Sequence, residues 1–170
     1  MESTISVRLW PPTRTLFKWG MKPIFVVILA FTVLAGESNP CPLILPKTSI
    51  FINGHRLVVE LAFTYESRAC GLSHRASLPQ NGGMLFIYRR AEVRTFWMKD
   101  TSLHLSIAFL DNSGTIINIE RMIPNQTEFK YHSNLPAKFA LEVHQGWFKE
   151  RGIRAGDRVI FRLPVQRVPN

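Results

Sequence analysis

Apolar and polar residues alternate with a period of two along much of the chain after residue 55. Residues 57–63 place four apolar side chains on one side of an extended segment, and residues 103–109 and 139–143 repeat this pattern. A helix would repeat its apolar positions every three or four residues, whereas the side chains of a strand point alternately to two faces. The alternation therefore predicts strands in these segments, and shorter apolar runs predict further strands at 84–88, 95–99, 115–123 and 159–163.

Turn and cap residues separate these predicted strands. The run Asp111-Asn112-Ser113-Gly114 lies between 103–109 and 115–123 and indicates a β-hairpin. Thr64 is suited to cap a short helix that runs to about Cys70 and ends at Gly71. One or two helical turns fit residues 146–151. Many short strands with little helix predict a mainly β fold, either an antiparallel β sandwich or a partly closed barrel, with one or two short helices.

The first 40 residues follow a different pattern. Residues 24–35 contain eleven apolar residues and one Thr, follow Lys18 and Lys22, and lead into the small pair Ala35-Gly36. This order predicts an exported chain whose signal peptide is cleaved after Ala35, with an uncleaved tether as the alternative. The uncharged stretch 23–36 spans about 21 Å as a helix, against a hydrocarbon core of about 30 Å, so we expect no stable transmembrane span.

The leader sets the expected compartment and the domain boundaries. Met21 begins a complete signal sequence by itself and is the expected true start. We expect a periplasmic protein if the source is a diderm bacterium, and a secreted protein otherwise. The predicted parts are a leader at 1–35, a mature N-terminal segment at 36–55, one domain at 56–163 and a C-terminal tail at 164–170.

The chain is basic, with 21 Lys and Arg against 12 Asp and Glu, a net charge of +9. Without the four cations and one acidic residue of the leader, the net charge is +6. Apart from Arg89-Arg90 the cations are spread singly, which indicates a solvated surface, with an anionic membrane surface or envelope polymer as the alternative. An exported chain is not expected to bind nucleic acid.

Cys41 and Cys70 are the two cysteines of the chain, and both lie in the predicted mature part. In an oxidising compartment such an isolated pair is a candidate disulfide. The spacing of the pair is not CxxC, which disfavours a thioredoxin-like redox site. The five histidines are scattered, with no pair at i and i+4, so we predict no metal site and no cofactor.

A set of short motifs carries a resemblance to a known family. The motifs are Gly71-Leu72-Ser73-His74-Arg75, Gly83-Met84-Leu85-Phe86, Phe96-Trp97-Met98-Lys99-Asp100-Thr101, Leu141-Glu142 with Gly146, and Gly152-Ile153 with Gly156-Asp157. In order and spacing, residues 56–163 resemble the DUF192 family, also called UPF0127. The resemblance implies a small, mostly β domain, often exported, without an established activity. It therefore brings no catalytic residues.

The chain departs from the family pattern at three places. Ser73 stands where Met is common, Asp100 where Asn is common, and His104-Leu105-Ser106 where the family has Pro-Leu-Asp. The last change removes a carboxylate that the family places there. Asp100 supplies one nearby.

Six residues inside or beside the motifs form the candidate binding site: Arg75, Trp97, Lys99, Asp100, His104 and Glu142. In a structural interpretation, Glu142 pairs with Arg75 or Lys99 across neighbouring strands. In a functional interpretation, the same groups line a pocket for a small polar or anionic ligand, with aromatic rings as a stacking wall. We assign no catalytic residue, because the adjacency of Ser73 and His74 in sequence does not establish that their side chains meet.

Two functions from different classes are consistent with these residues. The favoured one is a non-enzymatic binding or accessory module of the bacterial envelope that holds a small polar ligand or an envelope partner. The alternative is an envelope hydrolase for a sugar or ester, using Asp100, Glu142 or His104 as acid and base groups. Two titratable groups that converge in one open pocket would favour the enzyme, and a cluster sealed by ion pairs would indicate a structural role.

Overall fold

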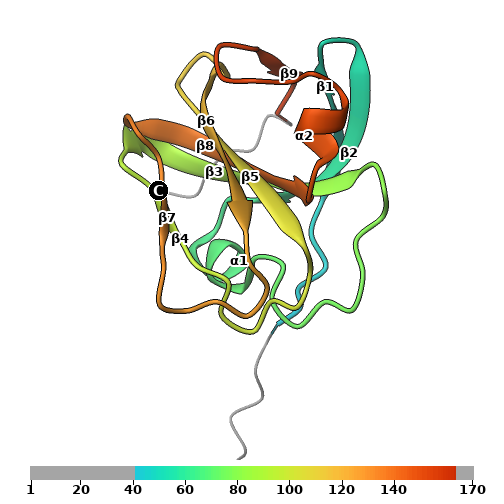
Figure 1. The fold of residues 1–170 in the computed structure, drawn as a ribbon, viewed down its shortest axis with the longest axis vertical. Coiled ribbons are helices and arrows are strands. Elements are labelled where there is room, and N and C mark those ends of the chain that lie inside the picture. The colour runs from blue at the N-terminus through green and yellow to red at the C-terminus, as the bar shows by residue number, and fades with distance from the viewer. Residues whose placement is uncertain (1–40, 164–170) are drawn as a thin grey trace, which may run out of the picture. The chain divides into compact units, whose positions relative to one another are not determined.

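The computed structural model describes residues 41–163, so the predicted signal peptide and C-terminal tail lie outside the described residues. In chain order the elements are β1 (Lys47–Ile52), β2 (His55–Ala62), α1 (Tyr65–Cys70), β3 (Gly82–Glu92), β4 (Thr95–Phe96), β5 (Leu105–Leu110), β6 (Ile116–Met122), β7 (Tyr131–His132), β8 (Ala137–His144), α2 (Trp147–Glu150) and β9 (Val159–Phe161). Over this range the fold is mainly β with two short helices, which confirms the predicted class (Figure 1). No helix within this range is long and apolar enough to cross a membrane.

One curled sheet dominates the described part of the chain. Its seven strands follow the order β6-β5-β8-β3-β2-β1-β9, and β4 pairs with β7 in a separate two-stranded ribbon. The curl makes the sheet a half barrel, the partly closed alternative of the prediction (Figure 1). Neighbouring strands are antiparallel except β2 and β3, which are parallel. Parallel neighbours need a crossover connection, and α1 with the loop after it forms this one.

Local chemistry explains where α1 begins and ends. The Thr64 hydroxyl accepts a hydrogen bond from the Ser67 amide at 3.1 Å, and the Ser67 hydroxyl accepts one from the Thr64 amide at 2.9 Å. This reciprocal capping satisfies amides that the first helical turn leaves free. Gly71 ends the helix with φ 51°, a left-handed backbone that glycine adopts readily. The helix therefore has the predicted cap residues at both ends.

The sheet is covered on both faces. One face packs a core that includes Leu57, Leu85, Leu141 and the α2 residues Trp147 and Phe148. The other face packs a second core around Met84, Phe86, Met98, Ile107 and Phe109. Because both cores cover the middle strands, every residue of β5 is buried, and so are all residues of β8 except Lys138 and His144. The polar residue Glu142 on β8 is consequently enclosed in the second core.

Two segments differ from the prediction. The strand expected at 95–99 is only Thr95–Phe96, because the chain turns after Met98, whose carbonyl accepts the Thr101 amide at 3.2 Å. Residues 47–52, within the predicted N-terminal segment, form strand β1 and pair with both β2 and β9. The hairpin expected around residues 111–114 is present, as β5 pairs with β6.

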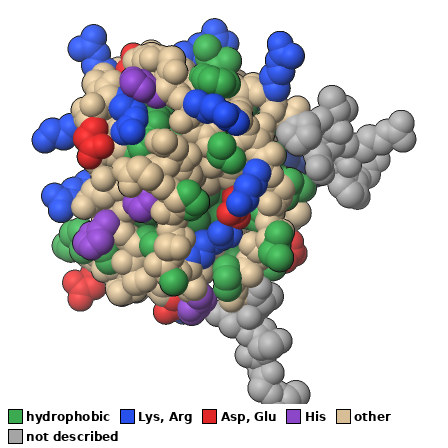
Figure 2. Space-filling view, turned by 90° about the vertical axis from the view of Figure 1, so that its right-hand side faces the viewer, with side chains coloured by type: hydrophobic (Ala, Val, Ile, Leu, Met, Phe, Trp, Pro, Cys, Tyr) green, Lys and Arg blue, Asp and Glu red, His purple; other side chains and the backbone are tan. Residues whose placement is uncertain are grey.

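Figure 2 shows Lys and Arg side chains distributed over the face in view.

Candidate functional site

A cavity of about 220 Å³ opens on the face of the sheet that packs the second core. One wall is the end of α1 and the segment after it, residues 68–74, and the other wall is residues 96–101. Glu142 on β8, Phe86 on β3 and Cys41 complete the lining. The crossover between β2 and β3 and the turn after β4 thus create the cavity together.

The two walls meet through residues with unusual backbone conformations. His74 has φ 58° and Asp100 has φ 53°, although neither is glycine. The His74 amide donates a hydrogen bond to the Asp100 carbonyl at 2.8 Å, and His74 Nε2 lies 3.9 Å from Asp100 Oδ2. Left-handed conformations at non-glycine residues cost free energy and concentrate at functional sites. The rim of the cavity is therefore held in a defined shape by its own backbone.

A third segment fixes the wall formed by residues 96–101. The Met98 amide donates to the Gln126 carbonyl at 3.1 Å, and the Asn125 amide donates to the Thr101 carbonyl at 2.9 Å. Met98 itself is buried, with 1% of its surface exposed. These bonds hold Trp97, Lys99 and Asp100 at the mouth, where all three are exposed.

Glu142 is the buried titratable group of the cavity. It pairs with Met84 on β3 and Ile107 on β5, and only 4% of its surface is exposed. Burial raises the pKa of this carboxyl from 4.5 to about 8. Over residues 41–163, the side chain of Glu142 makes no hydrogen bond and no ion pair. At neutral pH the cavity therefore contains a neutral carboxylic acid that is free to donate and accept hydrogen bonds.

A stack of cationic and aromatic groups lies beside this acid. The guanidinium carbons of Arg68 and Arg94 are 5.0 and 3.7 Å from the centroid of the Tyr88 ring. Burial raises the pKa of Tyr88, the two arginines lower it, and Glu142 adds a smaller upward effect. Arg68 lines the cavity as well, so it connects the cavity to the Tyr88 stack.

Cys41 and Cys70 are joined by a disulfide and line the cavity together. Their Cα atoms are 5.4 Å apart, within the usual range for such a bond. The bond attaches the segment before β1 to the end of α1. It thereby fixes one wall of the cavity.

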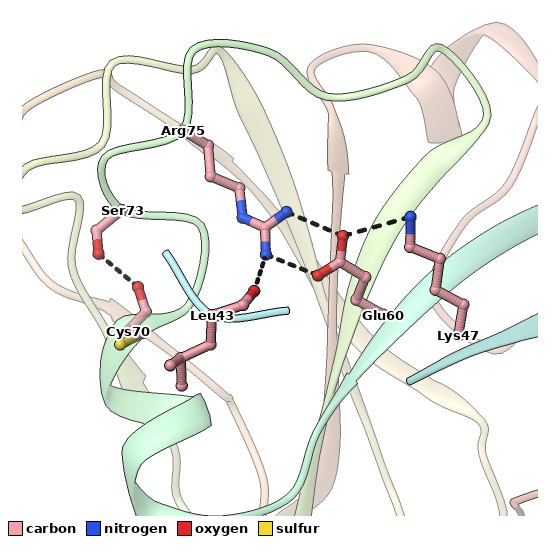
Figure 3. Close-up of polar contacts among 6 residues, drawn as sticks. All are labelled: Leu43, Lys47, Glu60, Cys70, Ser73 and Arg75. Atoms are coloured by element: carbon pink, nitrogen blue, oxygen red, sulfur yellow. Dashed lines mark hydrogen bonds and ion pairs between the residues drawn. The ribbon is translucent and has the colours of Figure 1, made fainter. Parts of the chain in front are cut away.

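The structural interpretation of Arg75 needs a correction. Arg75 does not pair with Glu142; its Nη1 and Nη2 donate to the Glu60 carboxylate at 2.9 and 2.6 Å (Figure 3). Nη2 also donates to the Leu43 carbonyl at 3.1 Å, and Lys47 Nζ lies 3.9 Å from Glu60 (Figure 3). Arg75 contacts Glu60 rather than Glu142 because Glu60 is on β2, beside the loop that holds Arg75. Glu142 is on β8, and β3 lies between β2 and β8. Lys99 likewise makes no ion pair with Glu142 in the described structure.

The cavity collects four of the six residues of the sequence-based site: Trp97, Lys99, Asp100 and Glu142. Arg75 and His104 do not line it. The side chain of His104 is exposed, and its carbonyl accepts the Gln145 amide at 2.9 Å. The Ser73 hydroxyl donates to the Cys70 carbonyl at 2.6 Å (Figure 3).

Two lining residues with basic side chains, Arg68 and His74, are absent from the sequence-based site. His74 lies inside one of the family-like motifs, next to the candidate residue Arg75, so the motif could have predicted that it belongs to the site. Arg68 lies in the predicted helix and had no such signal, since its role depends on where the crossover places α1. Within residues 41–163, no group of three or more His, Cys, Asp or Glu side chains is arranged to hold a metal ion.

Comparison with known proteins decides the family. The model of DUF192, described as "Uncharacterized ACR", matches residues 48–161. The chain belongs to the DUF192 family. This confirms the resemblance that the five motifs carry, and the match extends over β1 through β9.

Two solved structures resemble this DUF192 domain. A protein of Sinorhizobium meliloti 1021, described as a candidate transcription regulator, is 32% identical; the match covers 69% of this chain and 95% of that one, with a TM-score of 0.66. A protein of unknown function from Novosphingobium aromaticivorans DSM 12444 is 30% identical, with 69% and 86% covered and a TM-score of 0.65. The search of curated proteins gives no match. These two structures therefore support the fold of the domain.

Proposed function

We propose that this chain is an exported binding module of a bacterial envelope, and that its cavity holds a small polar ligand. The observation that carries the proposal is Glu142, a buried carboxyl on the cavity that has no polar partner in the described part of the chain. Burial disfavours the charged form of this carboxyl, so it faces the cavity as a neutral acid at neutral pH. A ligand that hydrogen-bonds this acid would satisfy its donor and its acceptor.

The cavity also indicates the kind of ligand. About 220 Å³ is below the range of roughly 300–1,000 Å³ that accepts drug-sized molecules. Phe86 and Phe96 supply apolar contact within the cavity, while Lys99 and Asp100 offer charges of both signs at the mouth. A small molecule with hydroxyl or carbonyl groups fits this lining, because the neutral acid of Glu142 both donates and accepts.

Two features support the envelope address. The leader at residues 1–35 has the order of cations, apolar run and small residues that signal peptides show. Disulfides such as Cys41–Cys70 persist in oxidising compartments and are rare in the bacterial cytosol. The expected result is that protein recovered from the envelope has an intact mass beginning at Gly36. Recovery of a cytosolic chain that begins at Met1 would contradict export.

Thermal melts test the binding site. The chain from Gly36 would be screened against monosaccharides, polyols, amides and amino acids, in search of compounds that raise the melting temperature. Glu142→Leu is expected to abolish the shift, because it removes both the donor and the acceptor that contact the ligand. Glu128→Leu, the same change at an exposed side chain outside the cavity, is the matched control and is expected to keep the shift. An equal shift in both variants would place the ligand elsewhere.

An envelope hydrolase is the second candidate. It is favoured by the convergence of His74, Asp100 and Glu142 on one cavity, since acid–base catalysis needs titratable groups beside one substrate. Nitrophenyl glycosides and esters would test it. Turnover should fall by about a hundredfold or more in both Glu142→Gln and Asp100→Asn if these groups exchange protons with substrate. Binding without turnover would leave the binding module as the function.

A further inference from the structure

Two asparagines of residues 41–163 are followed by glycine, and they lie in different surroundings. Asn53-Gly54 forms the turn between β1 and β2, and Asn81-Gly82 leads into β3. At such a pair the glycine nitrogen can attack the carbonyl carbon of the asparagine side chain, because glycine has no side chain to hinder the approach. Whether this reaction occurs in the folded chain depends on how freely these two groups can move.

The Asn53-Gly54 turn is open and weakly held. Both residues are exposed, and their φ angles of 48° and 84° are those of a two-residue hairpin loop. Within the described structure, neither the Asn53 side chain nor the Gly54 amide makes a hydrogen bond. A Cβ placed on Gly54 would have no atom within 4 Å. Fraying of the adjacent Ile52–His55 pair is therefore enough to free the turn.

The Asn81-Gly82 pair is held by three hydrogen bonds. The Gly82 amide, which would have to attack, donates to the Pro79 carbonyl at 2.7 Å. Asn81 Oδ1 accepts Trp147 Nε1 at 3.3 Å, and the Asn81 carbonyl accepts the Val58 amide at 2.9 Å. Gly82 is also buried, next to β2 in the sheet. Reaction at Asn81 thus requires opening of the sheet.

We propose that Asn53 is a site of spontaneous deamidation, whereas the fold protects Asn81. The Gly54 nitrogen loses its proton and attacks Asn53 Cγ, a C–N bond forms, and the side-chain nitrogen leaves as ammonia. Water then opens the resulting succinimide at either carbonyl, which gives aspartate or isoaspartate at position 53. Water is the only co-reactant, and no group is oxidised or reduced. The proposal is independent of any ligand in the cavity.

The position of the turn gives the reaction a structural consequence. Isoaspartate directs the main chain through the former side chain and so adds one carbon to a loop whose length fixes the strand register. Ile52, directly before the turn, pairs with His55 on β2 and with Val159 on β9, and Ile52 and Val159 are 0% and 2% exposed. In the sheet β9 pairs with residues 50–52 of β1. Isoaspartate at position 53 should therefore loosen β9.

Peptide mapping of aged protein tests the site. The chain from Gly36 is suitable, because the Sinorhizobium protein, 95% of which matches, contains little besides this domain. After incubation at mildly alkaline pH, trypsin releases residues 48–56 and 76–89 as separate peptides. Residues 48–56 should gain the mass of a hydroxyl in place of an amino group, in two chromatographic forms. Residues 76–89 should change at least about tenfold more slowly, because hydrogen bonds must break first.

Synthetic peptides of residues 48–56 and 76–89 are the matched control. They have the same Asn-Gly pairs without the fold, so they should react at comparable rates. The fold should slow the reaction of Asn81 far more than that of Asn53. Equal rates at the two sites in the folded protein would overturn the proposal. So would an unchanged Asn53 after a time in which its peptide has reacted.

Hydrogen exchange tests the consequence for β9. The amides of residues 159–161 should exchange about tenfold faster in the isoaspartate form than in fresh protein, because their pairing with β1 is weakened. The Asn53→Asp variant has the same added charge but a main chain of normal length. Its β9 amides should exchange as slowly as those of the parent. Unchanged exchange in the isoaspartate form, or an equal increase in the variant, would contradict the link between the turn and β9.

Discussion

Two glutamates in one row of the sheet have opposite surroundings. Glu60 on β2 is next to Met84 on β3, which is next to Glu142 on β8, so all three side chains lie on the same face. Glu60 accepts two hydrogen bonds from Arg75 and lies near Lys47 (Figure 3). Glu142 is more deeply buried and has no such partner in residues 41–163. The partner of a paired carboxylate accounts for its charge, whereas an unpaired carboxyl beside a cavity is a candidate ligand group.

The loop after α1 produces this difference. It brings Arg75 to β2, while its residues 71–74 stop at the wall of the cavity above Glu142. Neighbouring strands are about 4.8 Å apart, so Glu142 lies roughly 10 Å across the sheet from Glu60. Arg75 therefore serves one glutamate and leaves the other to the cavity.

The largest expected effect is the pH dependence that Glu142 imposes on stability. Its pKa is 4.5 in the unfolded chain and about 8 in the fold, so the folded state holds more protons between these values. Stability should be unaffected below pH 4.5, fall as the pH rises to about 8, and level off above it. Each pKa unit corresponds to about 1.4 kcal/mol, which limits the total loss to about 5 kcal/mol.

Urea unfolding of Glu142→Gln against the parent measures this effect. The variant should be more stable than the parent at pH 8 and equal to it at pH 4.5, because the amide does not ionise. Glu128→Gln should show the dependence of the parent. Parallel pH profiles for Glu142→Gln and the parent would mean that the carboxyl is partnered after all.

The Cys41–Cys70 disulfide supports both glutamates' surroundings, and its loss should be the next largest effect. The bond closes a separation of 29 residues. It should contribute roughly 3 to 4 kcal/mol in the chain-entropy model. The double variant Cys41→Ser/Cys70→Ser should lose this stability in urea and also lose ligand binding, since both cysteines line the cavity. Unchanged stability of the parent under reducing conditions would contradict this stabilising role of the disulfide.

Removing Arg75 should leave Glu60 without its main partner. The two side chains are 17% and 12% exposed, so Arg75→Ala should destabilise the fold by about 3 kcal/mol. The double variant Arg75→Ala/Glu60→Gln should recover part of this loss, because no charge is then left unpaired. Ligand binding should persist in both variants. Loss of binding in a folded Arg75→Ala variant would mean that Arg75 also contributes to the ligand site.

Lys47 should have the smallest effect on the same glutamate. Its Nζ is 3.9 Å from Glu60, and its side chain is 59% exposed. Solvent screens such a contact, so Lys47→Ala should change stability by about 0.5 kcal/mol or less. A loss as large as that of Arg75→Ala would show that the pair depends on total charge rather than on burial.

Most of the fold was predictable from local patterns. Alternation predicted the strands around residues 57–63 and 139–143, and the cap residues Thr64 and Gly71 predicted α1. The parallel pairing of β2 with β3 was not predictable, because it depends on how the crossover packs. The strand predicted at 95–99 was longer than the observed one. Alternation does not reveal the turn after Met98, which hydrogen bonds to the backbone of Asn125 and Gln126 hold in place.

The site was predictable in part for a similar reason. The motif residues Lys99, Asp100 and Glu142 do meet on one cavity. Arg75 is equally polar and lies in an equally suggestive motif, yet it contacts Glu60. Which glutamate an arginine reaches depends on strand order, and strand order is a property of the whole sheet rather than of a local sequence.

The backbone bonds that join the two walls also bear on how fast a ligand binds. The His74 amide is bonded to the Asp100 carbonyl, and the turn at Met98 to Thr101 is bonded to residues 125 and 126, so within residues 41–163 no segment has to fold over the ligand. Association with a preformed opening is a single encounter, without a preceding conformational step. The observed rate in stopped-flow mixing should consequently rise in proportion to ligand concentration, without reaching a plateau.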